Sequence, residues 1–369
     1  MHAEAFHVLL PAVAAVAVVA AVYFLAAYIR ATRSFTREHL LPREFPSSIV
    51  EVEPFLKARD ECEAPLQHLA GSSVTWANGS AERASLCIVY LHGWGASPLE
   101  IDPVDERVAA SLGATLLRYR LTAHGLSPLE RGANSLAEVQ SAVQLRRDAA
   151  TAHALGELLG ERVVLFGTST GGTLSVWLAS QSWVRAAAAN AELAAIVLTS
   201  PGFQIVTPLQ AVAKPLGWLL ALLPRPASGL LLRLLTGSRK LKPRSPALTG
   251  ARGEAQQRIW NRVQPIEAAL TVIGLYAICG ATCSLEDLDV PVLAFACPDD
   301  RTVSFYATRA AMRRMPRAEL DVMHGPHVEN AHVLTGAVAS PGSVDHVVER
   351  TVVFLKRELS KSGSGERTK

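Results

Sequence analysis

Charged residues are scarce in this chain of 369 residues. Only 19% of the residues are charged and 49% are hydrophobic, a composition that excludes a disordered or collagen-like protein. The 36 lysines and arginines nearly balance the 33 aspartates and glutamates, which leaves a net charge of +3. A nucleic-acid-binding protein usually carries a larger basic excess or a dense basic stripe, so we expect no nucleic-acid partner.

Cysteine is also rare. The five cysteines are odd in number and widely spaced, which argues against a disulfide framework. Cys279 and Cys283 lie four residues apart, but no second pair accompanies them, so the spacing does not indicate a zinc site.

One long segment lacks charge altogether. Val8 to Ile29 consists almost wholly of alanine, valine, leucine and aromatic residues, and as a helix its 22 residues would span about 33 Å, enough to cross a bilayer core. A cleaved signal peptide would carry a basic residue before a shorter apolar core, whereas here Arg30, Arg33 and Arg37 follow the run. The pattern predicts a single retained membrane anchor within residues 1–33, with the rest of the chain on the cytoplasmic side.

After the anchor, residues 34–70 are polar and punctuated by proline, and we expect them to form a linker. From there, short apolar runs typical of buried strands alternate with segments typical of helices. The expected strands are residues 86–91, 115–119, 162–166, 194–199, 291–296 and 319–323. This alternation predicts an α/β fold with a mostly parallel central sheet and helices on both faces.

One stretch breaks the alternation. Residues 201–286 contain no clear strand, and the part from Leu209 to Leu235 is dense in leucine. A pair of ordinary core helices would have the same composition, but the position between two expected strands favours an inserted helical cap. We therefore predict a core in two parts, residues 71–200 and 287–359, around this cap, and a polar disordered tail at residues 360–369.

A glycine-rich motif follows the strand expected at residues 162–166. Gly167 to Gly172 reads Gly-Thr-Ser-Thr-Gly-Gly and precedes a helical segment, so it has the Gly-x-Ser-x-Gly pattern in a strand–turn–helix context. Small neighbours permit a tight turn that lifts the Ser169 hydroxyl above the sheet, next to free N–H groups of a helix N-terminus. The motif predicts Ser169 as a nucleophile. The alternative is a glycine-rich turn with a structural serine.

A second glycine-rich turn follows the strand expected at residues 86–91. His92-Gly93-Trp94-Gly95 can direct a backbone N–H toward the same point as the amide of Thr170. We therefore expect the main-chain amides of Trp94 and Thr170 to form an oxyanion hole. His92 precedes the donor turn and is expected to be structural.

A serine nucleophile needs a base, and the base needs an orienting carboxylate. In proteins with this motif the acid and then the histidine follow the serine, each after a late strand. The candidate acids are Asp299 and Asp300, and the candidate bases are His324, His327 and His332. Three close histidines could also suggest a metal site, but no matching cysteine or carboxylate pattern accompanies them.

Together these motifs resemble the α/β-hydrolase superfamily, most closely its carboxylesterase and monoacylglycerol-lipase group, also described as serine aminopeptidase-like hydrolases. The resemblance covers about Leu86 to Leu355. In that family a small apolar residue stands three positions after the acid, as Val303 does after Asp300, so the resemblance implies Asp300 as the acid. The family's base usually lies between a glycine and an apolar residue. His332, between an alanine and a valine, matches best.

The resemblance implies hydrolysis of carboxylic esters through an acyl-enzyme on Ser169, with His332 as the base, Asp300 as its orienting acid, and no metal or organic cofactor. His124 lies in a loop that is not catalytic in such relatives. An apolar cap beside a membrane anchor predicts a lipid ester or monoacylglycerol as substrate. The alternatives are a non-enzymatic binding protein on the same scaffold, favoured by the alanines before His124 and His332, and a peptidase or acyltransferase with the same triad.

Overall fold

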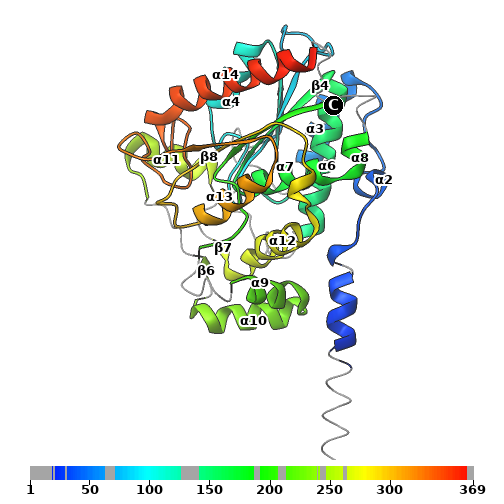
Figure 1. Ribbon diagram of the computed structural model, residues 1–369, viewed down its shortest axis with the longest axis vertical. Coiled ribbons are helices and arrows are strands. Elements are labelled where there is room, and N and C mark those ends of the chain that lie inside the picture. The colour runs from blue at the N-terminus through cyan, green and yellow to red at the C-terminus, as the bar shows by residue number, and fades with distance from the viewer. Residues whose placement is uncertain are drawn as a thin grey trace, which may run out of the picture.

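Seven strands form one sheet in the computed structural model of the protein (Figure 1). The structure describes residues 19, 21–29, 31–62, 71–125, 141–186, 192–206, 213–238, 240–241, 247–260 and 264–363. The strands, in their spatial order, are β1 (Ser73–Thr75), β3 (Thr115–Tyr119), β2 (Cys87–Leu91), β4 (Arg162–Thr168), β5 (Glu192–Thr199), β8 (Val292–Ala296) and β9 (Ala318–Val322).

Six of these strands are those predicted from apolar runs, and all six are parallel to one another. β2, β3 and β8 are buried along their whole length, which explains why their apolar runs are continuous instead of alternating. The predicted mostly parallel α/β sheet is therefore confirmed. β1 pairs antiparallel with β3 and was not predicted, because its three partly exposed residues form no apolar run.

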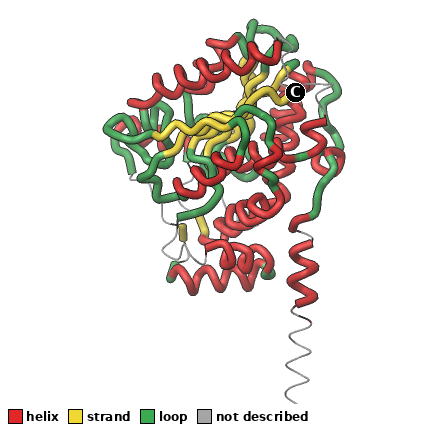
Figure 2. Tube along the Cα trace, viewed as in Figure 1, coloured by secondary structure: helices red, strands yellow, loops and turns green. Residues whose placement is uncertain are grey.

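Helices cover both faces of the sheet, as Figure 2 shows. The helices outside the insertion described below are α2 (Arg37–Leu40), α3 (Val52–Glu61), α4 (Val104–Leu112), α6 (Ala142–Leu159), α7 (Thr170–Ser180), α8 (Ser182–Ala186), α13 (Phe305–Arg314) and α14 (Val344–Gly363). Alternate side chains of β2 point to opposite faces. Val89 and Leu91 pack in one apolar cluster with α6 and α7, whereas Ile88 and Tyr90 pack in another with α4 and α14.

The chain segment between β5 and β8 is mainly helical. It contains α9 (Ala213–Leu222), α10 (Arg225–Thr236), α11 (Gly250–Ile259) and α12 (Ala269–Thr282), with the two-residue strands β6 (Lys240–Leu241) and β7 (Gln264–Pro265). Leu220, Leu232, Ile266 and Leu270 form a small apolar cluster of its own. In Figure 1 α9 and α10 lie at the end of the molecule opposite α14. The sequence did not predict β6 and β7, because a strand of two residues is too short to produce a recognisable hydrophobic pattern.

The segment expected to be a linker, residues 34–70, is instead partly built into the core. Leu40 of α2 and Val52 and Leu56 of α3 are almost completely buried in the apolar cluster beneath the sheet. The prolines that suggested a linker do not prevent this, because Pro54 lies in the first turn of α3, where a missing N–H leaves no helix bond unmade. At the other end α14 continues to Gly363, into the segment expected to be a disordered tail, and residues 364–369 lie outside the description.

The predicted anchor, Val8 to Ile29, lies largely outside the described residues. Its described part, residues 19 and 21–29, is helical. Among the described residues, no helix combines the length and the apolar character needed to cross a bilayer.

Candidate active site

Ser169 lies at the sharp turn between β4 and α7. It follows the last residue of β4, precedes the first residue of α7, and has a left-handed φ of 51°. This conformation is costly for a residue with a side chain and is held by its surroundings. A Cβ on Gly167 would lie 2.5 Å from the Gly171 carbonyl oxygen, and one on Gly171 would overlap the Leu91 carbonyl. The glycines of the motif are therefore steric requirements of the turn.

Asp300 and His332 lie in direct contact, although 32 residues separate them. Asp300 follows β8, His332 lies in the long loop after β9, and His332 Nδ1 is 2.8 Å from Asp300 Oδ2. The other oxygen, Asp300 Oδ1, accepts hydrogen bonds from the backbone N–H groups of Thr302 (2.6 Å) and Val303 (3.0 Å). The backbone N–H of His332 donates to Asn330 Oδ1 at 3.0 Å, which holds the histidine loop.

The other candidate acid and bases are not brought to this point. Asp299, His324 and His327 are exposed. Nor does any group of three histidines, cysteines or carboxylates in the described parts of the chain lie close enough to hold a metal ion. The geometry thus selects Asp300 with His332 from the five candidates that the sequence left open.

Ser169 and His332, both described, share no hydrogen bond in this structure. A polar partner of the Ser169 side chain comes from α12, where the buried Tyr276 hydroxyl interacts with the hydroxyls of Ser169, Thr170 and Thr173. The distance from Tyr276 Oη to Thr170 Oγ1 is 3.2 Å. Burial raises the pKa of the Tyr276 phenol and outweighs these hydrogen bonds, so the phenol is neutral. Hydrogen bonds of a catalytic triad are often incomplete before substrate binds.

The two turns that carry the expected oxyanion donors lie against each other. A Cβ on Gly93 would be 3.3 Å from Ser169 Cβ, which places the turn before Trp94 directly beside Ser169. Within the described structure, neither the Trp94 nor the Thr170 backbone N–H donates a hydrogen bond. Both amides therefore remain available to a ligand at this point.

Glu100, which the sequence pattern did not reveal, holds the turn that contains Gly93. Its buried carboxylate accepts hydrogen bonds from the Gly93 N–H (2.6 Å), the Tyr90 hydroxyl (3.3 Å) and the Trp260 indole N–H (3.2 Å). Burial raises the pKa of Glu100, while the Gly93 and Trp260 bonds oppose this rise. Because Trp260 follows α11, the same carboxylate joins the helical insertion to the turn beside Ser169.

The family follows from a comparison with protein-family models. The model of the alpha/beta hydrolase family matches residues 88–337, more than half of the chain. This chain belongs to the α/β-hydrolase family. A comparison with curated protein sequences finds no match.

Several solved structures are similar to this chain at low sequence identity. The structure reported with LipS and LipT, two metagenome-derived lipolytic enzymes, is 20% identical with a TM-score of 0.55, and the match covers 80% of this chain and 100% of that one. Ferulic-acid-bound Est1E from Butyrivibrio proteoclasticus is 16% identical (TM-score 0.49; 79% and 96% covered). The monoacylglycerol lipase of Paleococcus ferrophilus is also 16% identical (TM-score 0.49; 77% and 98% covered).

Two buried histidines, His92 and His124, lie beside the Gly93 turn of this α/β-hydrolase. The Leu121 N–H donates to His92 Nε2 at 3.0 Å, so His92 carries its proton on Nδ1, which lies 2.8 Å from the Gly93 carbonyl oxygen. The His124 ring lies 5.0 Å from that of His92 and 5.2 Å from that of Trp94. Burial lowers the pKa of His124 to about 4, and that of His92 also falls well below its usual value. Both rings are therefore neutral packing groups.

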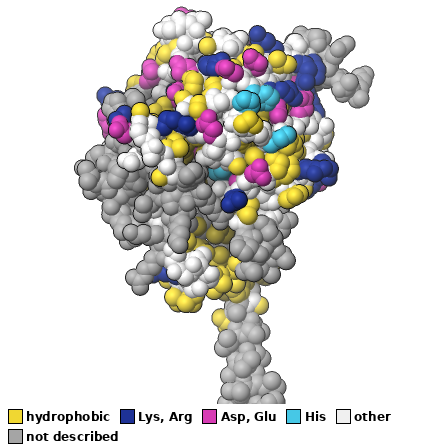
Figure 3. Space-filling view, turned by 90° about the vertical axis from the view of Figure 1, so that its left-hand side faces the viewer, with side chains coloured by type: hydrophobic (Ala, Val, Ile, Leu, Met, Phe, Trp, Pro, Cys, Tyr) yellow, Lys and Arg dark blue, Asp and Glu magenta, His cyan; other side chains and the backbone are white. Residues whose placement is uncertain are grey.

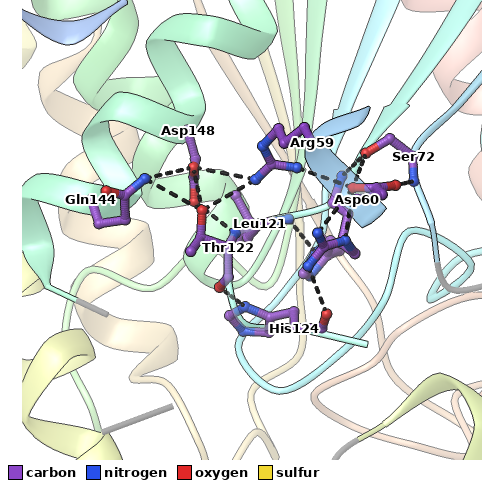
Figure 4. A network of polar contacts seen from close by, with 10 residues as sticks. Arg59, Asp60, Ser72, Leu121, Thr122, His124, Gln144 and Asp148 are labelled. Carbon is purple, nitrogen blue, oxygen red and sulfur yellow. Dashed lines mark hydrogen bonds and ion pairs between the residues drawn. The ribbon is translucent and has the colours of Figure 1, made fainter. Parts of the chain in front are cut away.

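A polar network fixes the loop that contains His124 (Figure 4). Asp148 of α6 accepts hydrogen bonds from the Thr122 N–H and hydroxyl, both at 2.8 Å. Arg59 of α3 reaches Asp148 at 3.4 Å. Ala123 has a left-handed φ of 61°, at the position where the resembling family has glycine. The network accounts for how an alanine keeps this conformation, because both sides of the loop are tied down.

A groove of about 690 Å³ lies between α12 and α13. Thr173, Gly202, Tyr276 and Asp300 line it, close to the nucleophile turn and the acid. Apolar and thiol side chains of α12 and α13 line much of the remainder. A Cβ on Gly202 would overlap the Tyr276 hydroxyl, so Tyr276 packs directly on the backbone there; its side chain both lines the groove and interacts with Ser169.

Proposed function

We propose that this α/β-hydrolase is a membrane-anchored serine hydrolase that cleaves carboxylic esters through a covalent acyl-enzyme. The observation that carries the proposal is the 2.8 Å contact between His332 Nδ1 and Asp300 Oδ2, beside a serine held in a strained turn. The loops after β8 and β9 bring an acid and a base together in the pairing that orients a histidine for proton transfer.

The proposed reaction has two halves, acylation of Ser169 and hydrolysis of the acyl-enzyme, and the same groups act in both. Asp300 accepts a hydrogen bond from the Nδ1–H of His332, which leaves the unprotonated Nε2 free to take the proton of Ser169 as its oxygen attacks the ester carbonyl carbon. The Trp94 and Thr170 amides stabilise the oxyanion, a contribution of about 3–4 kcal/mol per donor. His332 then protonates the departing alcohol. In the second half it deprotonates a water that attacks the acyl-enzyme carbonyl carbon, and it returns that proton to the Ser169 oxygen as the bond to the acyl group breaks and the carboxylic acid leaves.

We assign lipid or acylglycerol esters as the substrate class. The support is the apolar groove between α12 and α13 and the leucine-rich insertion above it. Each buried CH₂ of an acyl chain would contribute about 0.8 kcal/mol to binding. A chain-length series tests this assignment. We expect octanoyl esters to be preferred over acetyl esters, and the reverse order would contradict the assignment.

We also propose that residues 1–33 anchor the protein in a membrane with its body on the cytoplasmic side. Val19, Val22 and Ile29 are exposed apolar side chains in the described helix, and arginines follow it. Protease treatment of sealed vesicles tests the orientation. Digestion of the body from the outer, non-cytoplasmic face would contradict it.

A fluorophosphonate probe tests the nucleophile without knowledge of the substrate. We expect the full chain to be labelled and its Ser169→Ala variant to remain unlabelled, with hydrolysis lowered by about 10⁶-fold. Labelling that persists in a folded Ser169→Ala variant would place the nucleophile elsewhere.

One observation favours a second function, that of a non-enzymatic binding protein on this scaffold. Ser169 interacts with Tyr276 and has no hydrogen bond to His332, so its hydroxyl lacks a base in this state. Failure of the folded full chain to react with the probe, in detergent and in vesicles alike, would support this alternative.

A further inference from the structure

One helix of the insertion exposes a row of leucines. In α10, Leu230 is 60% exposed and Leu234 is 73% exposed, and Leu235 beside them is half exposed. The opposite side of the helix is buried, since Ser228 and Leu232 pack inward. Leu230 and Leu234 are four residues apart and therefore lie on one face of the helix. We call this row, with the exposed Leu219 of α9, the cap face.

The cap face lies next to the apolar N-terminal helix. The ring of Tyr28 lies 5.2 Å from that of Trp218 in α9. In Figure 1 α10 lies crosswise to the N-terminal helix at the end where that helix leaves the body, and Figure 3 shows hydrophobic side chains gathered at this end. Val22 and Leu25 of the helix are about as exposed as Leu230. The cap face and the N-terminal helix thus expose apolar side chains at the same end of the body.

The insertion also carries a strong positive charge. Residues 201–286 contain ten lysines and arginines but only three acidic residues, a net charge of +7 in a chain of +3, so the remaining sequence is negative. No aspartate or glutamate occurs between Glu192 and Glu254, a stretch with eight basic residues. An exposed apolar helix face within a basic segment matches a bilayer surface that contains anionic lipids.

We propose that the cap face docks on the surface of an anionic lipid bilayer. α10 lies along the surface with Leu230 and Leu234 among the upper acyl chains, while basic side chains of the insertion meet the headgroups. A second copy of this chain is a poorer occupant, because pairing two such faces would bring two insertions of net charge +7 together. The surface stands independently of the proposed catalytic reaction.

Docking here would bear on the active site. α12 packs against α9 and carries Tyr276, which lines the groove and interacts with Ser169. Contact of α9 and α10 with lipid would therefore hold the groove near the source of a lipid ester. This consequence, unlike the docking itself, rests on the proposed esterase function.

The first experiment places a bimane label on the thiol introduced by Leu234→Cys in the full chain, with exposed Cys62 replaced by serine. Val353→Cys on α14, an equally exposed apolar position at the other end of the molecule, is the control. The protein is reconstituted in vesicles of phosphatidylcholine and phosphatidylglycerol that contain doxyl-labelled lipid. We expect quenching at position 234 and none at position 353.

Equal quenching at both positions would overturn the docking surface. Quenching at position 234 that is as strong in vesicles of phosphatidylcholine alone as in the mixed vesicles would overturn the role of anionic lipid. A blue shift at position 234 that already occurs in detergent, together with a doubled mass, would assign the face to a second copy instead. None of these outcomes depends on hydrolysis, so loss of the proposed activity would not obscure them.

The second experiment compares hydrolysis of a vesicle-embedded long-chain ester with that of a water-soluble ester. We expect Leu230→Glu/Leu234→Glu to lower the ratio of the first rate to the second by about tenfold or more, because two charges would enter the apolar layer. Val353→Glu should leave the ratio unchanged. An unchanged ratio in the double variant would overturn the proposed coupling to the site.

Discussion

At the scale of single residues, the sequence predicts a site residue where short-range steric constraints determine the local backbone. Gly167 and Gly171 leave no room for side chains, and the motif around Ser169 reports this steric fact directly. The acid and base were narrowed only to candidates, because a histidine in a long loop carries no local signal of its partner. Asp300 and His332 meet through the parallel order of β8 and β9, which the motifs do not encode.

Neighbouring aspartates provide a matched test of the acid. Asp300→Asn should lower kcat by about 10⁴-fold, because an amide would favour the wrong tautomer of His332. Asp299→Asn, one residue away and exposed, should leave kcat within a few-fold of the parent. Steady-state kinetics on a soluble ester would measure both, and an equal loss in the two variants would contradict the assignment.

Glu100 offers a second test at this scale. Glu100→Gln replaces one of two acceptor oxygens by a donor that faces the Gly93 or Trp260 N–H. We expect kcat to fall by roughly tenfold or more with KM little changed, because the turn beside the oxyanion amides loosens.

The partner of this carboxylate makes the test specific. Trp260→Phe should add little to the loss in Glu100→Gln, since both remove the same link between the insertion and the turn. The exposed Glu106→Gln on α4 is the control for loss of a carboxylate. Strictly additive effects of the two changes would show that Glu100 acts without the insertion.

At the scale of elements, strands were predicted far better than the insertion. Buried parallel strands are continuous apolar runs, and this signal survives without knowledge of the fold. The helices of the insertion pack on one another through their own apolar cluster, and α12 meets α7 through contacts such as that of Tyr276 with Thr170. These contacts depend on tertiary placement, so Tyr276 and Glu100 could not be assigned to the site in advance.

Alanine substitutions at two glycines, one packed against α12 and one within it, distinguish the effect of close packing from that of helix propensity. Gly202→Ala should displace Tyr276, because the added Cβ overlaps its hydroxyl, and should cost about 1–3 kcal/mol of unfolding free energy. Gly280→Ala, in α12 itself, meets no atom within 4 Å and should leave stability equal or slightly higher. Chemical denaturation measures both. Similar losses in the two variants would contradict the packing of Tyr276 on Gly202.

At the scale of the whole molecule, the N-terminal segment belongs to the folded body. Leu40, Val52 and Leu56 are buried in the main core, and Arg59 and Asp60 join the network of Figure 4. Full burial of such side chains contributes about 1.5–3 kcal/mol each.

This predicts where a truncation is tolerated. A chain that begins at residue 31 should unfold cooperatively at nearly the melting temperature of the full chain in detergent. A chain that begins at residue 71 should be strongly destabilised or fail to fold. Thermal unfolding monitored by circular dichroism would compare the two truncated chains. A stable fold in the chain that begins at residue 71 would show that α2 and α3 only cover the surface.

The stability of the whole molecule should fall at acid pH. Burial in α6 lowers the pKa of His153 to about 3, and neither ring nitrogen has a hydrogen-bond partner in the described structure. Between pH 6.5 and 3 the unfolded chain therefore binds a proton that the folded chain does not, so the unfolding free energy falls as the pH drops through this window. At pH 5 this group alone removes roughly 2 kcal/mol.

Replacement of His153 by a hydrophobic residue tests the predicted direction in which the unfolding free energy changes with pH. His153→Leu should flatten the decline in unfolding free energy between pH 7 and pH 5. His327→Leu, at an exposed position, should leave the decline unchanged. A decline in the His153→Leu variant as steep as that of the parent chain would show that His153 is not buried neutral.

Taken by itself, the sequence determined the parallel sheet, the turn around Ser169 and the short sets of candidate acids and bases. These features depend on apolar runs, on glycine sterics and on chain order, which are local properties. Only the tertiary structure decided that Asp300 meets His332, that Glu100 joins the insertion to the Gly93 turn, and that residues 34–62 belong to the body. Such contacts join residues tens to hundreds of positions apart, and their energy exists only once the chain has folded around them.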